Sequence, residues 1–398
     1  MKPIVLKKCL KKYTYDTDKA ETPKDTIGRV TRVLKGQGLN IVFEKLENRA
    51  NIPVYRVVSA DPSKDYSSLV FSGKAHGKGA TESQAKCSAL MEWVERVNAG
   101  NAIRLLAKDK ETIFRAHETI PSESTIDIKY MLSYSHNPSF YGKSAERIIK
   151  RKKMHFMKAY CLTDKRERYL PFLWHLYFNG SNGLASGNTY EEAVLQALCE
   201  VIERHNIVEI KTLNSKVNAI ELGFPCKPLA EMLSKIQEVT ARPIIQKWSR
   251  PIPVPTVACR LHDSTGYGTA PSPAKAAMRA ITEAIQEDTA TRRYGQDSAT
   301  IKIESQEPIP LSSMESLERE DLYDEINEIS RILESMGHMI YVMDFSSIVP
   351  IPTVEVIVPG LRSVDYTGRD RHLREFQSCL IEYFNLVASL PQWNILTA

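Results

Sequence analysis

Acidic side chains recur in pairs along this chain, three residues apart and followed by arginine. Residues 187–204 read G-N-T-Y-E-E-A-V-L-Q-A-L-C-E-V-I-E-R, and residues 79–96 read G-A-T-E-S-Q-A-K-C-S-A-L-M-E-W-V-E-R. Aligned without a gap, the two segments share two glutamates and an arginine: Glu92, Glu95 and Arg96 in one, Glu200, Glu203 and Arg204 in the other. A looser third copy follows Gly268, with Glu283 at the first carboxylate position and Gln286 at the second.

Residues three and four apart share one face of a helix, so each pair of carboxylates should project together. Like charges at this spacing repel by roughly 0.2–0.5 kcal/mol, and a hard divalent cation would offset that repulsion. Brought together, the two pairs and Glu283 would form an all-oxygen cage of the kind that Mg²⁺ prefers when it also holds phosphates. The alternative is that each E-x-x-E-R is a solvated helix face with intrahelical ion pairs. Three copies in one phase favour the metal site.

The elements that must position these side chains repeat as well. Each copy has a Gly-containing loop, then Thr or Ser at a plausible N-cap, then a helix of good helix formers. The copies are roughly 80–110 residues apart, whereas solenoid repeats have periods of about 20–50 residues. We therefore expect one supersecondary unit reused inside a larger domain.

Composition bounds the class of protein. The chain has 398 residues, 42% hydrophobic and 25% charged, with a formal net charge of +5. These values predict a soluble globular protein that binds anionic ligands without requiring nucleic acid. Seven scattered cysteines without C-x-x-C argue against disulfides and against zinc, and they favour the cytoplasm. Neither a signal peptide nor a membrane-spanning run is expected.

Along the chain we expect a loosely held basic arm over residues 1–21 and a single domain over residues 22–398. A helix should begin at Thr22-Pro23 and run to about Leu34. We also predict strands at 40–43, 54–60, 67–71, 155–161, 169–172, 252–260, 338–344 and 353–358. Helices are expected at 228–241, 314–336 and 369–390, and a variable insertion at about 100–155. The aromatic run 172–178 should be core, and the basic run 147–153 either a solvated face or a docking site for an acidic partner.

Four motifs together resemble the YcaO family. They are S-x-x-x-E-x-x-E-R at Ser88–Arg96, S-N-G-L-A-S-G-N-T from Ser181, R-A-I-T-E-A-I-Q at Arg279–Gln286 and V-I-V-P-G-L at Val356–Leu361. The resemblance covers most of the chain, roughly residues 22–361. It implies an α/β (α+β) fold, a YcaO-like domain in which pseudo-repeated Gly-loop/helix units converge on a site for ATP and Mg²⁺.

The resemblance also implies roles for individual residues. The expected metal ligands are Glu92, Glu95, Glu200, Glu203 and Glu283. The expected ATP-binding residues are Lys19, Thr26, Arg29, Ser88, Asn188, Glu192, Arg204, Arg279 and Gln286. Glu203, Arg204 and Arg279 are the expected catalytic residues. Without the family, Lys19, Thr26 and Arg29 could be an ordinary basic surface cluster.

In activity, the resemblance implies that ATP and Mg²⁺ activate a peptide-backbone amide by phosphorylating its oxygen. We favour the branch in which an external sulfide then forms a thioamide, because the chain has no fused peptide-recognition module and no proline-rich tail. It resembles the stand-alone archaeal type, which thioamidates a glycine of methyl-coenzyme M reductase (its α subunit is the candidate substrate), often with a TfuA partner. The oligomeric state stays open, a homodimer included.

Three other functions stay open. An azoline-forming cyclodehydratase would use a neighbouring Cys, Ser or Thr of the peptide in place of sulfide. A ligase or phosphotransferase would act on a small acceptor. A non-catalytic ATP-binding scaffold is disfavoured because the first carboxylate is present in all three copies.

Overall fold

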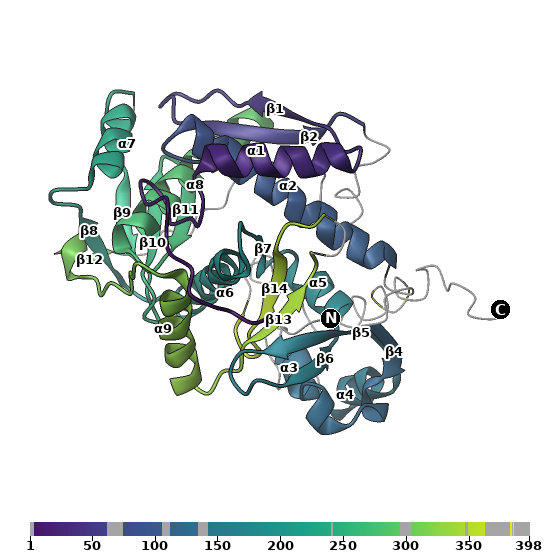
Figure 1. Cartoon of the computed structure of the whole chain (residues 1–398). Helices are drawn as coiled ribbons and strands as arrows, with labels where there is room; N and C mark the ends of the chain where they lie inside the picture. Colours follow the sequence, from purple (N-terminus) through teal and green to yellow (C-terminus); the bar gives the residue numbers. More distant parts are fainter. Residues whose placement is uncertain are drawn as a thin grey trace.

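The structure is a computed structural model that describes residues 4–61, 75–105, 112–133, 142–239, 242–294, 305–346 and 349–362, together with Tyr383 and Asn385. The strand predicted over residues 67–71 and most of the helix predicted over residues 369–390 lie outside these ranges. In the described part, three β-sheets surround the helices α2, α6 and α8, which lie near the middle of the molecule (Figure 1).

The first sheet is antiparallel and has the order β1-β2-β3. Its strands are β1 (Ile41–Lys45), β2 (Val54–Ser59) and β3 (Ala75–Lys78). Helix α2 (Glu82–Leu105) packs on β2 and β3, and α1 (Pro23–Gly36) packs against α2. The Thr22 side chain accepts a hydrogen bond from the Asp25 N–H and proline follows at the first helical position, so the predicted start of α1 is confirmed.

The second sheet has the order β4-β5-β13-β14-β7, with β6 also paired to β5. Its strands are β4 (Thr112–Ala116), β5 (Lys153–Cys161), β6 (Glu167–Leu170), β7 (Leu184–Ser186), β13 (Tyr341–Asp344) and β14 (Thr353–Ile357). Helix α6 (Tyr190–Thr212) packs on β7 and β14 and against α9 (Leu322–Ser335). The smaller helices of this part are α3 (Ile128–Ser133), α4 (Gly142–Arg151) and α5 (Phe172–Asn179).

The third sheet has the order β11-β10-β9-β8-β12 and is antiparallel except for the parallel pair β8 and β12. Its strands are β8 (Val217–Glu221), β9 (Ile244–Lys247), β10 (Thr256–Leu261), β11 (Ser264–Thr269) and β12 (Ser305–Pro310). Helix α8 (Pro273–Tyr294) packs on β10 and β11, and α7 (Lys227–Gln237) contacts α8. The α/β (α+β) expectation, with one long helix on each sheet, is confirmed.

In the first and third copies the Gly-containing segment ahead of the long helix is a strand, so the prediction of a loop is wrong there, whereas Gly187, ahead of α6, lies in a loop as predicted. Gly77 lies in β3, and Gly266 and Gly268 lie in β11. A Cβ added to Gly77 would lie 2.0 Å from the Ala89 backbone nitrogen, and one on Gly266 would lie 2.1 Å from that of Ala284. Glycine is therefore required because strand and helix backbones touch.

The repeated unit is longer than the sequence alignment suggested. In α2, the Asn98 Nδ2 group donates to the Val349 carbonyl (3.2 Å) and to the Thr353 hydroxyl (2.8 Å). In α6, Asn206 makes the same pair of bonds, to the Ile252 carbonyl and the Thr256 hydroxyl, each 3.0 Å. The segments that they hold read V-P-I-P-T (349–353) and I-P-V-P-T (252–256). Each helix thus lies on one sheet and anchors the segment that leads into a strand of another sheet, β14 for α2 and β10 for α6.

Two further expectations need correction. The strand predicted over residues 169–172 is β6, which ends at Leu170, and residues 172–179 form the helix α5. This run is buried, which confirms the prediction of core. The acidic helix begins at Leu322 instead of residue 314, because the Asp321 side chain caps it by accepting from the Tyr323 N–H.

The arm at the N-terminus is not loosely held. The Cys9 N–H donates to the Asp321 carboxylate (2.8 Å), and the Ala20 N–H donates to the Glu192 carboxylate (2.9 Å) in a buried contact. This segment crosses the middle of the molecule in Figure 1. The domain boundary predicted after residue 21 stays a prediction.

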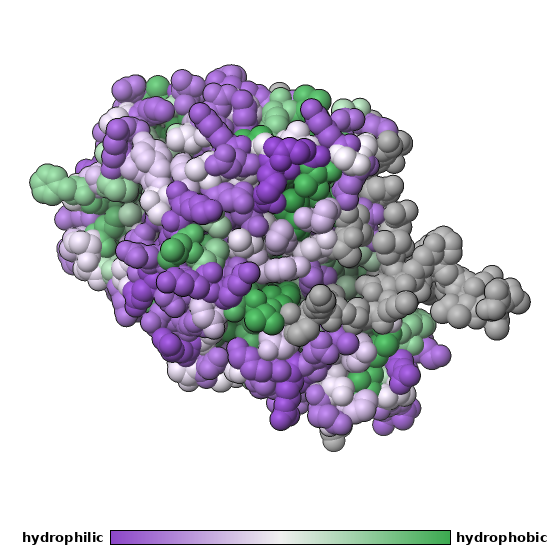
Figure 2. All heavy atoms as spheres, viewed as in Figure 1, coloured by the Kyte–Doolittle hydropathy of each residue, from purple (hydrophilic) through white to green (hydrophobic). Residues whose placement is uncertain are grey.

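The face of the molecule seen in Figure 2 is mostly hydrophilic, with apolar residues in small separate groups. Among the helices of the described ranges, we find none with the length and apolar character needed to cross a bilayer.

Candidate active site

One cavity of about 360 Å³ lies where α2, α6 and α8 meet β3 and the N-terminal segment. Glu95, Glu203 and Glu283 come from the three different helices and line this same cavity. Eleven of the residues expected in the site line it: Lys19, Ser88, Glu92, Glu95, Glu192, Glu200, Glu203, Arg204, Arg279, Glu283 and Gln286. The predicted convergence of the repeated units on one site is therefore present, whereas the role of each residue stays a prediction.

The cavity is costly for negative charge. Burial raises the pKa of Glu95 to about 8, and the neighbouring Glu92 carboxylate adds to this shift. Burial likewise raises the pKa of Glu200 to about 8, against the opposing influence of Arg204. For Glu203, burial and the charge of Glu283 both raise the pKa. Acidic groups that are held close together at this cost are typical of functional sites.

Basic side chains offset part of that charge. Arg96 pairs with Glu92 one helical turn away, and the Arg204 guanidinium lies 3.9 Å from the Glu200 carboxylate. The intrahelical ion pairs of the alternative interpretation therefore exist, but they face a cavity and not bulk solvent. Burial opposes ionisation of Glu283, yet its pKa is lowered because Lys78 lies 2.7 Å away and Arg204 is also near.

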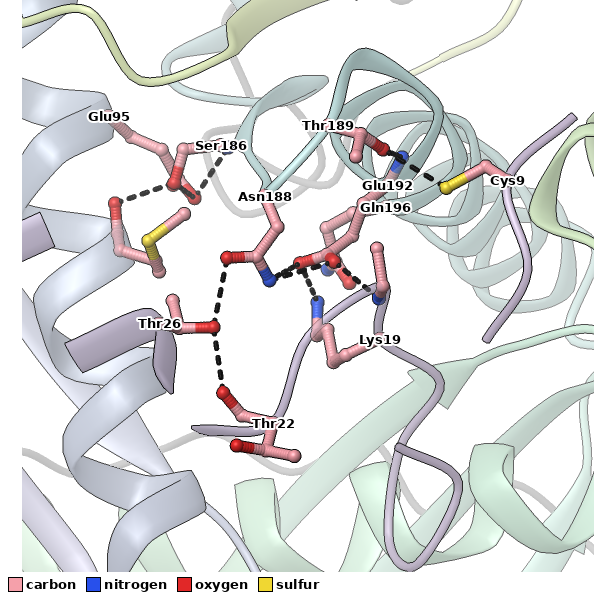
Figure 3. Close-up of polar contacts among 12 residues, drawn as sticks. Cys9, Lys19, Thr22, Thr26, Glu95, Ser186, Asn188, Thr189, Glu192 and Gln196 are labelled. Carbon is pink, nitrogen blue, oxygen red and sulfur yellow. Dashed lines mark hydrogen bonds and ion pairs between the residues drawn. The ribbon is translucent and has the colours of Figure 1, made fainter. Parts of the chain in front are cut away.

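On one side of the cavity, a polar chain joins the N-terminal segment to α1 and α6 (Figure 3). The Lys19 ammonium lies 3.2 Å from the Glu192 carboxylate. The Asn188 amide donates to the same carboxylate at 3.0 Å, and its oxygen accepts from the Thr26 hydroxyl at 2.9 Å. The Arg29 guanidinium donates to that amide oxygen at 2.6 Å. Three expected residues, Thr26, Arg29 and Asn188, thus adjoin the cavity through Glu192.

Several residues of the site escaped the sequence analysis. Lys78 ends β3 and reaches Glu283 across 205 positions of sequence. Gln196 accepts a hydrogen bond from Arg279 and so ties α6 to α8. The repeat could have revealed Gln196, because it takes the place that Ser88 and Arg279 hold in the other copies, four residues before the first carboxylate. No local signal marks Lys78.

Hydrogen bonds between neighbouring elements hold the carboxylates in place. The Ser186 N–H donates to the Glu95 carboxylate at 2.9 Å, and the Ser186 hydroxyl donates to the Met91 carbonyl at 2.9 Å (Figure 3). The His76 N–H donates to Glu92 at 2.7 Å. These contacts tie α2 to β7 and to β3 and so fix the acidic face of α2.

The chemistry of this cavity fits a magnesium nucleotide. Within the described ranges, no three His, Cys, Asp or Glu side chains are grouped closely enough to hold a metal by themselves. Mg²⁺ commonly takes one or two protein carboxylates together with substrate phosphates, so a looser acidic arrangement suits it. The raised carboxyl pKa values indicate that a cation would stabilise these carboxylates in their ionised form. The lysine and arginine side chains of the cavity can pair with a polyphosphate.

Comparison with solved structures supports the fold. Over 89% of this chain and 94% of the other, the structure is similar to YcaO from Methanopyrus kandleri, solved with AMPPCP and Mg²⁺, with a TM-score of 0.65 and 20% identity. A heterocyclase solved with substrate and cofactor gives a TM-score of 0.67 at 19% identity; the match covers 91% of this chain but only 55% of the heterocyclase.

Two sequence relatives are also informative. An uncharacterized protein of Methanothermobacter thermautotrophicus is 26% identical over 372 residues, covering 82% of this chain and 91% of the relative. A Rhizobium leguminosarum bv. trifolii protein described as lying in the tfuA 3' region is 27% identical over 238 residues, covering 48% of this chain and 54% of that protein.

The model of the YcaO cyclodehydratase family, which is ATP- and Mg²⁺-binding, matches residues 76–362. This span is more than half of the 398 residues and holds all three long helices. The chain therefore belongs to the YcaO family.

Proposed function

We propose that this protein uses ATP and Mg²⁺ to activate a peptide-backbone amide and that an external sulfide then converts the amide to a thioamide. The observation that carries the proposal is the meeting of Glu95, Glu203 and Glu283 at one cavity that lysine and arginine side chains also line. Membership in an ATP- and Mg²⁺-binding family supports the same conclusion.

In this proposal, the nucleotide supplies the phosphoryl group that turns the amide oxygen into a leaving group, and Mg²⁺ balances the charge of the phosphates. The chain contributes position and electrostatics. Arg279, fixed by the Thr269 carbonyl at 2.6 Å, presents its guanidinium to the cavity. Lys19 and Arg204 add positive charge from the N-terminal segment and from α6.

In this proposal the carboxylates also lose protons when the cation binds. With a pKa of about 8, Glu95 and Glu200 are largely protonated at neutral pH. A bound cation needs carboxylates in their ionised form, so loading the site should release protons. Burial and the charge of Glu283 raise the pKa of Glu203. Burial of Glu283 is outweighed by Lys78 and Arg204, which lower its pKa, so Glu203 is the group of this pair that a cation would help to ionise.

Thioamidation is preferred over azoline formation because one relative lies in a tfuA 3' region. We therefore propose a TfuA-like partner, a sulfide donor and a protein substrate, with a glycine of the methyl-coenzyme M reductase α subunit as the first candidate. The proposed location is the cytoplasm, which suits six cysteines that are unpaired in the described ranges. A homodimer is compatible with this function.

The test is intact-mass analysis of a glycine-containing peptide incubated with the protein, ATP, Mg²⁺ and sulfide. Exchange of oxygen for sulfur adds about 16 Da, and cyclodehydration of a Cys-, Ser- or Thr-containing peptide removes about 18 Da. The mass gain should require ATP and sulfide together. A mass loss without sulfide would select the cyclodehydratase.

Variants separate the remaining alternatives. Glu203→Gln should abolish the mass gain and peptide-dependent ATP hydrolysis, whereas Glu315→Gln, at an exposed position, should leave both unchanged. Hydrolysis that does not depend on peptide would favour a small-acceptor ligase or phosphotransferase. Unchanged hydrolysis in Glu203→Gln would contradict the assigned site and revive the non-catalytic scaffold.

A further inference from the structure

Residues 9–20 form a strap that contributes to the cavity, although they lie outside the span matched by the family model. Asp16, Thr17 and Lys19 line the cavity. The strap doubles back on itself, since the Lys19 N–H donates to the Tyr13 carbonyl at 2.9 Å. The position of Lys19 therefore depends on what holds this strap.

A buried ion cluster holds one side of the strap to α9. The Lys11 ammonium lies 3.0 Å from the Asp18 carboxylate and 2.6 Å from the Glu325 carboxylate. The side chains of Lys11, Asp18 and Glu325 are only 4%, 7% and 0% exposed. At such burial, removing one charge leaves its partner uncompensated, so these contacts strongly fix the geometry.

A second lysine joins the same carboxylate to α8. Lys275, 9% exposed, pairs with Asp18 and lies 2.6 Å from the Glu318 carboxylate. It is located in the first turn of α8, one turn before Arg279. Asp18 is thus held between Lys11 and Lys275, and its neighbour in sequence is Lys19.

Hydrogen bonds at Lys11 and at Asp16 also hold the strap to neighbouring segments. The Lys11 N–H donates to the Glu320 carbonyl at 3.1 Å. The Asp16 carboxylate accepts from the Tyr13 hydroxyl at 2.7 Å and from the Ala80 N–H at 2.8 Å. These contacts link the strap to the segment before α9 and to the residues ahead of α2, and the Ala20 N–H holds its far end to Glu192, so the two lysines act on Asp18 between these anchors.

We propose that Lys11 and Lys275 are positioning residues for the nucleotide site. By clamping Asp18 between α9 and α8, they hold Lys19 beside Glu192 before a nucleotide arrives. Neither lysine lines the main cavity, so they act through Lys19. The inference rests on the proposed function in one respect only, that the cavity takes a magnesium nucleotide.

The experiment uses a double variant that removes the clamp without leaving a buried charge unpaired on α9. Lys11→Met with Glu325→Gln replaces both members of one buried pair, which is often close to neutral for stability. The control is Lys158→Met with Glu167→Gln, the same two substitutions at a more exposed ion pair, 3.4 Å apart, on β5 and β6. Lys275→Arg tests whether a retained charge preserves function.

Three readouts apply to the full chain, and the first is binding of a non-hydrolysable ATP analogue in the presence of Mg²⁺. The dissociation constant of the analogue should rise roughly tenfold or more in the double variant, as expected for a lost charge-assisted hydrogen bond. Without nucleotide, trypsin should cleave after Lys12 or Lys19 faster than in the wild type. In steady-state assays KM for ATP should rise, whereas kcat at saturating ATP should hold. The control should match the wild type, and Lys275→Arg should lie near it.

The outcomes are separable. A folded double variant with unchanged affinity and unchanged cleavage would overturn the inference and make the cluster a purely structural one. A wild-type protein that does not bind the analogue would overturn the proposed function, and the inference with it.

Discussion

Replacing a carboxylate of the site should make the empty protein more stable at alkaline pH. Burial raises the pKa of Glu95 from 4.5 to about 8. A group whose pKa is higher in the folded state stabilises the fold fully below its unfolded pKa, and that contribution is lost as pH rises through the folded pKa. The melting temperature of the wild type should therefore fall between about pH 5 and pH 8.5.

The magnitude follows from the shift. One pKa unit corresponds to about 1.4 kcal/mol, so the shift of Glu95 amounts to roughly 5 kcal/mol at full ionisation. The side chain lies in a cavity that admits water, which reduces this to about 1–3 kcal/mol. Glu95→Gln should therefore raise the melting temperature at pH 8.5 by roughly 1–4 °C for a chain of this length. Glutamine keeps an oxygen for the Ser186 N–H.

The assay is thermal unfolding at about pH 6 and pH 8.5, with and without Mg²⁺ and a non-hydrolysable ATP analogue. At the lower pH the variant should exceed the wild type by less than at pH 8.5, since the difference begins to grow above the unfolded pKa of 4.5 and levels off only above the folded pKa of about 8. The ligands should stabilise the wild type more than the variant at pH 8.5. The control is Glu315→Gln, at an exposed position, which should leave the melting temperature unchanged at both pH values. A variant that is less stable than the wild type at both pH values would refute the electrostatic reasoning.

Three further predictions concern the repeated unit and the site. Gly266→Ala should destabilise the fold by about 1–3 kcal/mol or more, because the added Cβ would meet the α8 backbone. The control is Gly28→Ala, which has open space around it and should stabilise α1 by about 0.5–1 kcal/mol. Thermal unfolding of the two variants measures the difference. Asn206→Ala should cost about 1–3 kcal/mol in urea unfolding, because it leaves buried groups of the 252–256 segment unpaired. Glu200→Gln should weaken the Mg²⁺ dependence of nucleotide binding in titration calorimetry while the protein stays folded, and an unchanged Mg²⁺ dependence would remove Glu200 from the expected ligand set.

Much of the site could be predicted from the sequence because it is built from short-range spacing. The i, i+3 and i, i+4 relations place Glu92 beside Glu95 and Glu200 beside Glu203 whatever the rest of the chain does. Because three segments repeat that spacing, the sequence predicts that their carboxylates meet at one site. The N-cap at Thr189, confirmed by its bond to the Glu192 N–H at 3.2 Å, is equally local.

Other features depend on contacts between distant segments. A glycine next to a predicted helix looks the same whether it cradles an anion in a loop or lets a strand touch the helix, and only the 2.1 Å approach at Gly266 decides for the strand. Similarly, a Lys-rich terminus predicts a solvated arm, because nothing local reveals that Glu325, more than 300 residues away, will neutralise Lys11. Local spacing thus determined which groups could do chemistry, since helix geometry repeats every few residues. Tertiary packing decided which charges meet and which are neutralised, since pairing of buried charges depends on residues from opposite ends of the chain.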